Sequence, residues 1–197
     1  MNELVFLLEE ESARELVNVL FRALVPEEAA ATVRFIVFEG KQDLERQLER
    51  KLRGYLNPHA RFVVMRDQDR GDCRAVKQGL AEICREAGRP DAVVRIACRE
   101  LESFYLADLR AVELGLGIHG LAPKQNKAKY RDPDHLHSPA RELEKLTGRP
   151  YQKVAGSRAI APHLSLASTR SRSFWHLVQA IRSIGESFAV EGRIHPA

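Results

Sequence analysis

The sequence contains few cysteines: Cys73, Cys84 and Cys98 are its three in 197 residues, and no two of them have C-x-x-C spacing. This pattern excludes a disulfide framework and a structural zinc site of the usual kind, and it favours a reducing compartment, so we expect a cytoplasmic protein. No basic segment precedes the first apolar run, so we expect no secretory signal. No apolar stretch approaches the roughly 20 residues that span a bilayer, so we expect no membrane contact.

Acidic residues are absent from 145 to 185, although the whole chain carries 27 of them against 31 Lys and Arg, for a net charge of +4. That stretch supplies only positive charge, and a basic run from 123 to 131 precedes it. Such surfaces neutralise phosphates without reading sequence. We therefore expect nucleic acid contact through these residues: Lys124, Lys127, Lys129, Arg131, Lys153, Arg158, Arg170 and Arg172. Tyr130, Tyr151 and Trp175 are candidates to stack on bases. The alternative is that the basic residues pair with the acidic first half and that the aromatics fill the core.

Apolar runs and amphipathic patterns alternate through the first half of the chain. Strands are predicted over 4–8, 32–38, 62–65 and 92–98, and helices over 13–24, 42–55, 74–87 and from about 102 to 114. Ser12 and Glu15 have the spacing of a capping box for the first helix. Short connections between strands and helices predict an α/β fold with a parallel four-stranded sheet covered by helices on both faces. We expect an α/β core over 1–114 and a basic, mainly helical region over 115–197, with helices at 138–146 and 173–188, packed on that core.

Charged residues follow directly after all four predicted strands. Glu9 to Glu11 follow the first, Glu39 and Lys41 the second, Asp67 and Asp69 the third, and Glu100 and Glu102 the fourth. Because ligands of open α/β sheets bind beyond the carboxyl ends of the strands, these side chains form the candidate site. Carboxylate oxygens are the ligands that Mg2+ and Mn2+ prefer. His135, His137 and His163 lie in predicted loops, where we expect plain surface residues.

The Asp67-Gln68-Asp69 segment is the centre of that candidate site. On an extended chain, residues two apart point to the same side. Two carboxylates about 4 Å apart repel by about 4 kcal/mol at an effective dielectric near 20, so a cation between them is favoured. The sequence therefore predicts a divalent metal, Mg2+ or Mn2+, at Asp67 and Asp69.

Several motifs in the sequence resemble those of known protein families. Leu7-Leu8-Glu9 before a helix and Phe62-Val-Val-Met-Arg-Asp-Gln-Asp69 after a later strand resemble the TOPRIM fold of topoisomerases, primases and OLD-family nucleases. Five further motifs are similar to those of a family of small bacterial TOPRIM proteins that includes the AriB-type effector nucleases of phage defence. They are Phe38-Glu-Gly-Lys41, Arg66-Asp-Gln-Asp-Arg-Gly-Asp-Cys73, Cys98-Arg-Glu-Leu-Glu-Ser-Phe-Tyr105, Tyr151-Gln-Lys-Val-Ala-Gly-Ser-Arg-Ala-Ile-Ala-Pro-His163 and Arg170-Ser-Arg-Ser-Phe174.

The resemblance implies roles for the acids. Glu9 corresponds to the TOPRIM glutamate, Asp67 and Asp69 to its Mg2+-binding pair, and Glu100 or Glu102 to a further acid that helps hold a second metal in OLD-type proteins. Glu10 and Ala13 stand where relatives often have glycine and an acid, which leaves open whether Glu9 or Glu10 is used and whether one metal binds or two. Some members act with an ABC- or OLD-type ATPase, and we also expect a homodimer.

The function predicted from these features is a metal-dependent nuclease acting on RNA, such as tRNA, or on DNA, as an effector in phage defence. Asp67, Asp69 and Glu100 or Glu102 hold the metal, Glu9 serves as ligand or general base, and Lys41 stabilises charge on the phosphate. The alternative is a non-catalytic regulatory or scaffold subunit that binds an ATPase partner or nucleic acid. An aspartyl phosphatase and a sugar-nucleotide transferase fit the sequence less well: Asp72 stands where the phosphatase motif has threonine or valine, and no donor-binding pattern is present.

Overall fold

Four parallel strands form one sheet in the order β2-β1-β3-β4. In the computed structural model, which describes residues 2–148 and 150–194, they are β1 (Glu3–Leu8), β2 (Thr32–Val37), β3 (Ala60–Asp67) and β4 (Val93–Ala97). Leu8 is paired with Val37 on one side and with Met65 on the other. The carboxyl ends of all four strands therefore lie at one edge, which confirms the predicted parallel α/β sheet.

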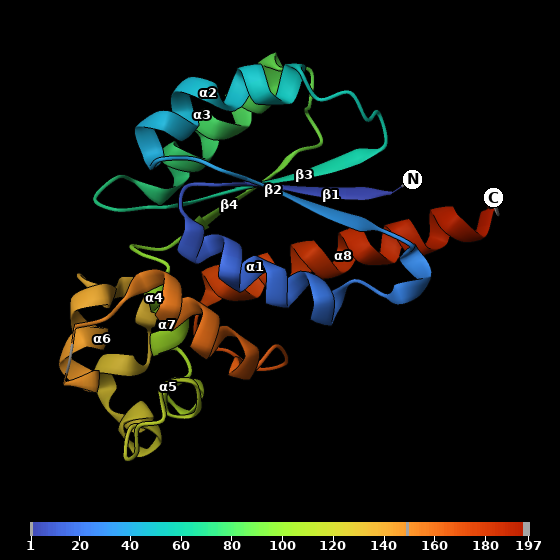
Figure 1. The fold of residues 1–197 in the computed structure, drawn as a ribbon. Coiled ribbons are helices and arrows are strands. Elements are labelled where there is room, and N and C mark those ends of the chain that lie inside the picture. Colours follow the sequence, from blue (N-terminus) through green and yellow to red (C-terminus); the bar gives the residue numbers. More distant parts are fainter. Residues whose placement is uncertain (1, 149, 195–197) are drawn as a thin grey trace.

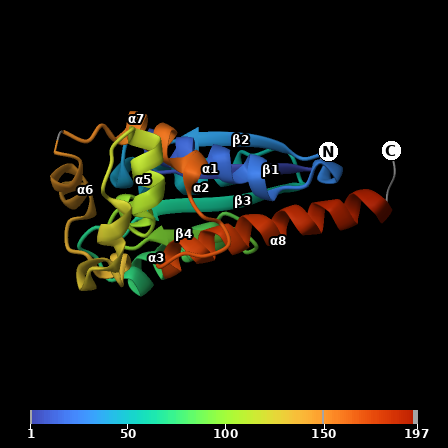
Figure 2. The same ribbon diagram turned by 90° about the horizontal axis from the view of Figure 1, so that it is seen from below.

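The two faces of the sheet are covered by different helices (Figure 1). Alternate residues such as Val5, Leu7 and Val64 lie in a cluster with Leu44 and Leu48 of α2 (Lys41–Arg53), beside α3 (Cys73–Glu86). The other set, with Phe6, Leu8 and Met65, packs against α1 (Glu11–Leu24) and α8 (Arg172–Ile194). Seen from below, α8 runs along this second face, so the last helix of the chain covers the sheet that the first half builds (Figure 2).

A helical lobe stands at the carboxyl edge of the sheet (Figure 1). It is built from α4 (Glu102–Leu106), α5 (Leu109–Leu116), α6 (Pro139–Thr147) and α7 (Lys153–Ile160), with short 3-10 helices at 122–126, 128–130, 133–135 and 161–163. Helix α7 packs on α1 and α5. A Cβ on Gly115 would lie 2.5 Å from the Ala159 carbonyl oxygen, so only glycine permits this approach of α5 to α7. The lobe therefore places α7 beside the start of α1, at the edge where the strands end.

The two regions predicted from the sequence share one hydrophobic core. Phe6 and Leu16 belong to the same buried cluster as Tyr105, Phe174 and Leu177. The point between residues 114 and 115 lies inside α5. Among the described helices, none is both long enough and apolar enough to cross a bilayer.

Some predicted helix ends were wrong. The first helix begins after Glu10, not Ser12, and the Ser12 hydroxyl donates to the Glu10 carboxylate instead of capping the helix. The helix expected to run to residue 114 breaks into α4 and α5, because Asp108 caps the second one by accepting a hydrogen bond from Ala111 N at 3.0 Å. Helix α7 was not predicted, and α8 continues to Ile194.

Candidate metal centre and nucleic-acid interface

The strand ends bring Glu9 and Asp67 together. Glu9 N donates to Met65 O at 3.2 Å, which continues the β1–β3 pairing one residue beyond the strand. In return, Asp67 N donates to Glu9 Oε2 at 3.0 Å. Burial raises the pKa of Glu9, helped by the charges of Asp69 and Glu10, while the Asp67 N–H and Arg66 oppose the rise. Glu9 is thus fixed against the end of β3 and holds its proton more strongly than an exposed glutamate.

The Asp67 carboxylate has no hydrogen-bond or ion-pair partner among the described residues, although it is largely surrounded by protein. Burial raises its pKa well above the ordinary value, and the charges of Glu102, Glu10 and Glu9 raise it further. Both Glu9 and Glu10 are therefore close enough to act on Asp67, and the choice between these two glutamates stays open.

Glu102, at the start of α4, is the most unusual acid of the group. Its side chain is 0% exposed, and neither carboxylate oxygen has a hydrogen-bond partner in the described structure. Burial raises its pKa to about 7, against the opposing charge of Lys153. An unpartnered buried carboxylate costs several kcal/mol of desolvation, so a residue held in this way suggests a cationic ligand.

Glu100, the other acid after β4, is directed elsewhere. Its Oε2 accepts a hydrogen bond from Ala140 N, at 2.8 Å, in the first turn of α6. Of the two acids that the sequence left open at this position, Glu102 is therefore the one that adjoins Asp67. Glu100 remains a candidate ligand by sequence, but in the structure its carboxylate stabilises the lobe.

Lys153 brings positive charge into the group of acids. Its Nζ lies 3.1 Å from Glu10 Oε2 and 3.3 Å from Glu10 Oε1. Burial lowers its pKa, but the charges of Glu102, Glu10 and Asp67 outweigh that effect and raise it above the ordinary value. Predicted as a nucleic-acid contact, Lys153 neutralises the acidic site in this arrangement.

Asp69 has different neighbours from Asp67. The chain is not extended there: Asp69 has a φ of 56°, and its N–H donates to Arg99 O at 2.8 Å. Its Oδ2 accepts a hydrogen bond from Lys41 Nζ at 2.8 Å and lies 3.7 Å from Arg66 NH2. The expected extended backbone through residue 69 was wrong, so the spacing rule of a strand does not apply to the two side chains. The charge of Asp69 still acts on Glu9, whose carboxylate accepts from Asp67 N. Lys41 and Asp69 are nevertheless brought together, as two members of the predicted site.

In the described chain, no three Asp, Glu, His or Cys side chains are arranged to hold a metal ion as they stand. The acids nevertheless fit a hard cation, since both Glu102 carboxylate oxygens are buried without a partner and the charge of Glu102 acts on Asp67. Lys153 and Lys41 occupy positions next to the remaining acids. A divalent cation at Asp67 and Glu102 would compete with the ammonium of Lys153 for the same negative charge.

Arg66 belongs to the site and was missed in the sequence. Its side chain is 5% exposed, donates from Nε to Asp67 O at 2.9 Å, and pairs with Glu45. The same guanidinium lies 3.8 Å from Glu9 Oε2. An arginine directly after the apolar run of β3 was the only signal, and the alternation of a strand did not show that this side chain would be buried between acids.

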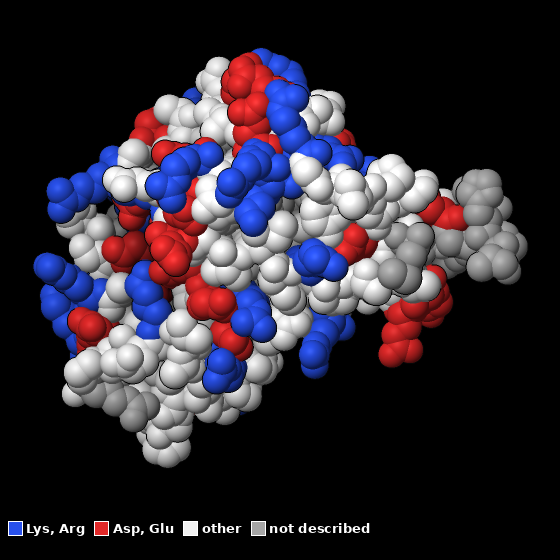
Figure 3. Space-filling view, turned by 45° about the horizontal axis from the view of Figure 1, so that its top comes forward, with Lys and Arg blue, Asp and Glu red and all other residues white. Residues whose placement is uncertain are grey.

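The predicted nucleic-acid contacts fall into two groups. Lys129 pairs with Glu142, Arg158 with Glu15 at 2.9 Å, Lys153 with Glu10, and Arg170 donates to Gln125 O at 3.0 Å. Four have no side-chain ion pair or hydrogen bond within the described part of the chain: Lys124, Lys127, Arg131 and Arg172. Figure 3 shows basic side chains around acidic ones on one face of the molecule. Pairing with acids, the alternative weighed for this basic region, therefore applies to only part of it.

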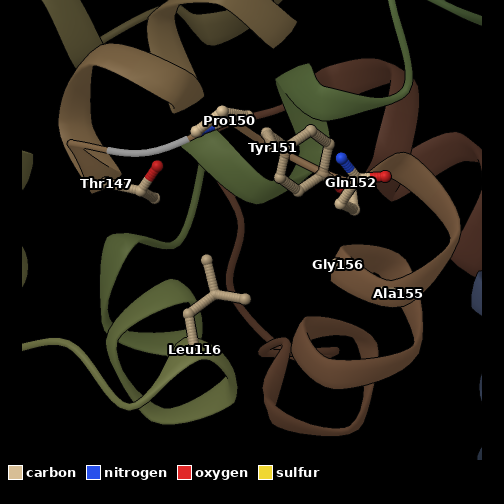
Figure 4. Close-up of a pocket in the computed structure, with 7 residues that line it drawn as sticks. All are labelled: Leu116, Thr147, Pro150, Tyr151, Gln152, Ala155 and Gly156. Atoms are coloured by element: carbon tan, nitrogen blue, oxygen red, sulfur yellow. The ribbon is translucent and has the colours of Figure 1, made fainter.

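The three aromatic candidates also differ. Tyr130 is 3% exposed and its hydroxyl donates to Glu142 at 2.6 Å, so it belongs to the core and the stacking interpretation was wrong for it. Trp175 remains 47% exposed. Tyr151 is half-buried and lies against Gly156 in a hollow of about 280 Å3 between the ends of α5, α6 and α7 (Figure 4). Trp175 and Tyr151 are therefore the two aromatic side chains left as candidates for stacking.

Comparison with known proteins identifies a family. A family model described as Domain of unknown function (DUF4276) matches residues 8–182, so the chain belongs to the DUF4276 family. No curated protein and no solved structure matches the chain.

Proposed function

We propose that this DUF4276 protein is a metal-dependent nuclease that hydrolyses phosphodiester bonds of RNA or DNA. The observation that carries the proposal is the fully buried Glu102 carboxylate without partners, placed beside Asp67 at the carboxyl edge of the parallel sheet. Ligands of open α/β sheets bind at this edge. The TOPRIM-like motifs around Glu9 and Asp67 support the same chemistry.

Asp67 and Glu102 would hold Mg2+ or Mn2+, with Glu9 or Glu10 completing the set of oxygen ligands. When bound, such a cation lowers the pKa of its water and polarises a phosphate oxygen. Asp69 contacts the side chains of Lys41 and Arg66 and holds these two positively charged groups beside the metal ligands. The proposal holds for one bound metal ion or for two.

The protein's own side chains supply proton transfer and charge neutralisation. Glu9 has a raised pKa and is oriented by the Asp67 N–H, which suits a general base that accepts a proton from water. Lys41 is half-exposed beside Asp69 and suits the stabilisation of negative charge that develops on a phosphate. Arg66 is buried, contacts Glu9 and Asp69, and is assigned the role of holding these two carboxylates in position.

The remaining parts of the proposal concern substrate and setting. The basic residues without partners, Lys124, Lys127, Arg131 and Arg172, support an anionic polymer such as nucleic acid. The likeness to AriB-type effectors supports a role in phage defence in the cytoplasm, an ABC- or OLD-type ATPase partner and a homodimer.

The test is a hydrolysis assay on tRNA, other RNA and DNA with Mg2+ or Mn2+, with EDTA as the blank. The protein is assayed alone and together with an ABC- or OLD-type ATPase from the same genome. We expect Asp67→Asn to lower the rate at least about a hundredfold, because a metal ligand contributes several kcal/mol. Asp91→Asn is the matched control, since Asp91 is exposed and lies at the opposite end of β4. Absence of hydrolysis under all these conditions would overturn the proposal.

A second function is favoured by one observation. Lys153 and Lys41 already neutralise Glu10 and Asp69, as in a site that has no metal to hold. In that case the protein is a regulatory or scaffold subunit that binds an ATPase partner or nucleic acid. Under this function, Asp67→Asn and Glu9→Gln leave the cellular phenotype unchanged, whereas a nuclease loses it.

A further inference from the structure

A polar hollow of about 310 Å3 opens beside the acidic site, between the turn after β3, the turn after β4 and the start of α6. Three arginines line it: Arg70, Arg99 and Arg141. They come from three separate segments of the chain, and His137 stands beside Arg141 on the lobe side. Its volume lies at the low end of the range for small-ligand sites. None of these four residues was assigned to the site from the sequence.

The three guanidinium groups are not paired with acids in the described part of the protein. None of them forms a side-chain hydrogen bond or ion pair with another residue that the structure describes, whereas Arg14, Arg46 and Arg85 each pair with an acid on their own helix. The two carboxylates in the lining are already engaged. Asp69 accepts from Lys41, and Glu100 accepts from Ala140 N. The lining therefore carries three guanidinium groups against two carboxylates, and no described side chain occupies the guanidinium donors.

The backbone holds this hollow in a specific shape. Asp69 and Arg99 have φ values of 56° and 65°, in the left-handed region that non-glycine residues rarely adopt. Each such residue costs about 1–3 kcal/mol and persists where its surroundings enforce it, often at functional sites. The two are joined by the 2.8 Å hydrogen bond from Asp69 N to Arg99 O, and Arg99 N donates to Gln68 Oε1 at 3.2 Å. These bonds fix the backbone of the turn that carries Arg99 against the turn that carries Asp69.

We propose that this hollow binds a phosphate group of the nucleic acid strand, next to the bond that is cut. The inference rests on the proposed function and names the part of the substrate that the hollow holds. A guanidinium group can donate two parallel hydrogen bonds to two oxygens of one phosphate. Three arginines around the hollow can therefore bind several oxygens of the same phosphate group. Asp69 lies in this lining and its charge acts on Glu9, whose carboxylate accepts from Asp67 N, so a phosphate held here lies beside the acidic site.

The phosphate has two sources, which differ in chemistry. It is either a terminal phosphomonoester, as at the 5′ end of a cut strand, or an internal phosphodiester next to the scissile one. Both are bound by the same arginines. A comparison of oligonucleotides with and without a 5′-phosphate distinguishes them.

The experiment measures binding without hydrolysis. A fluorescent single-stranded oligonucleotide, with either a 5′-phosphate or a 5′-hydroxyl, is titrated with the full-length protein in EDTA, and anisotropy gives the Kd. We expect Arg141→Ala and Arg99→Ala each to weaken binding about tenfold or more, because hydrogen bonds to charged groups contribute about 1.5–3 kcal/mol. Arg22→Ala is the matched control, since Arg22 is exposed at the end of α1, at the opposite edge of the sheet. Arg141→Lys keeps the charge without the fork and is expected to fall between the wild type and Arg141→Ala.

Each outcome has a defined meaning. Loss of affinity confined to the 5′-phosphorylated probe supports the terminal source, and equal loss for both probes supports the internal one. Unchanged Kd values for Arg99→Ala and Arg141→Ala overturn the proposal, even if the protein hydrolyses nucleic acid. If the protein binds through these arginines but hydrolyses nothing, the proposed nuclease activity fails and the phosphate site stands. Because Arg141 is exposed on α6, its variant tests the hollow even if Arg99→Ala does not fold.

Discussion

The Lys153 ammonium lies 3.1 Å from the Glu10 carboxylate, although 143 residues separate them in the sequence. The contact joins the first residue of α7 to the residue that precedes α1, and a second pair, Arg158 with Glu15, joins α7 to α1 further along both helices. Lys153 also adjoins Glu102 and Asp67, whose charges raise its pKa. The charge balance of the acidic site is thus completed by the C-terminal half of the chain.

Replacing Lys153 by methionine should increase the effect of divalent cations on the protein. Without the ammonium, the carboxylates of Glu10, Glu102 and Asp67 repel one another. A bound divalent cation relieves this repulsion, so its binding becomes more favourable. We expect Mn2+ to bind about tenfold more tightly, so that it raises the Tm by about 4 °C more than in the wild type. Thermal unfolding with and without Mn2+ measures the difference, and Lys127→Met is the control for loss of an unpaired surface lysine. An equal Mn2+ effect in wild type and Lys153→Met would show that no cation competes with Lys153.

Replacing Glu102 by leucine should stabilise the metal-free protein while it removes hydrolysis. The buried carboxylate has no hydrogen-bond partner, and Lys153 still has its ion pair with Glu10 after the substitution. Relief of an unsatisfied buried group predicts a gain of about 1–3 kcal/mol in the free energy of unfolding. Urea denaturation measures it. Glu100→Leu is the comparison, because it removes the acceptor of Ala140 N and should lower stability. A Glu102→Leu protein less stable than the wild type contradicts this account.

Arg66 should be indispensable for stability. It is 5% exposed and lies among Glu9, Glu45 and Asp69. Removing one partner of a buried ionic group leaves the other charges uncompensated, so Arg66→Ala should lower the free energy of unfolding by about 3–5 kcal/mol. Arg74→Ala, at an exposed position on α3, should change it little. Equal denaturation midpoints for these two variants would disprove the role assigned to Arg66.

The pair between Glu15 and Arg158 should make stability depend on pH in the acid range. The hydrogen bond from Arg158, and then its charge, hold the pKa of Glu15 below its ordinary value of 4.5, against the effect of burial. A carboxyl with a lowered pKa in the folded state stabilises the fold above pH 4.5, and this contribution is lost as the pH falls through the folded-state pKa.

Glu15→Gln should therefore lower the Tm by about 1–3 °C at pH 7, and the difference from wild type should shrink toward zero at pH 3. Scanning calorimetry at both pH values measures it. Glu28→Gln, at an exposed position, should show no such dependence. A difference that is the same at pH 3 and pH 7 would rule out the ionised pair as its cause.

The sheet could be predicted because its signals are local. An apolar run such as 4–8 followed by an amphipathic helix requires a covered parallel strand, and Asp67 follows its strand directly wherever that strand is placed in the sheet. The same reasoning put Glu9, Asp67 and Glu102 at one edge. Buried leucines at 44 and 48 confirm the helical stripe that was read from their spacing.

The sequence by itself thus determined the sheet, its covering helices and the edge on which the acids gather. Only the tertiary structure decided which of those acids meet. Asp69 has a left-handed backbone and pairs with Lys41, and Glu100 accepts from Ala140 N of a distant helix, so Glu102 is the acid after β4 that adjoins Asp67. Lys153 and Arg141 reach the site from helices whose placement depends on the packing of α7 on α1 and of α6 on α4. Side-chain direction beyond a strand end follows from backbone angles and long-range contacts, which residue spacing does not encode.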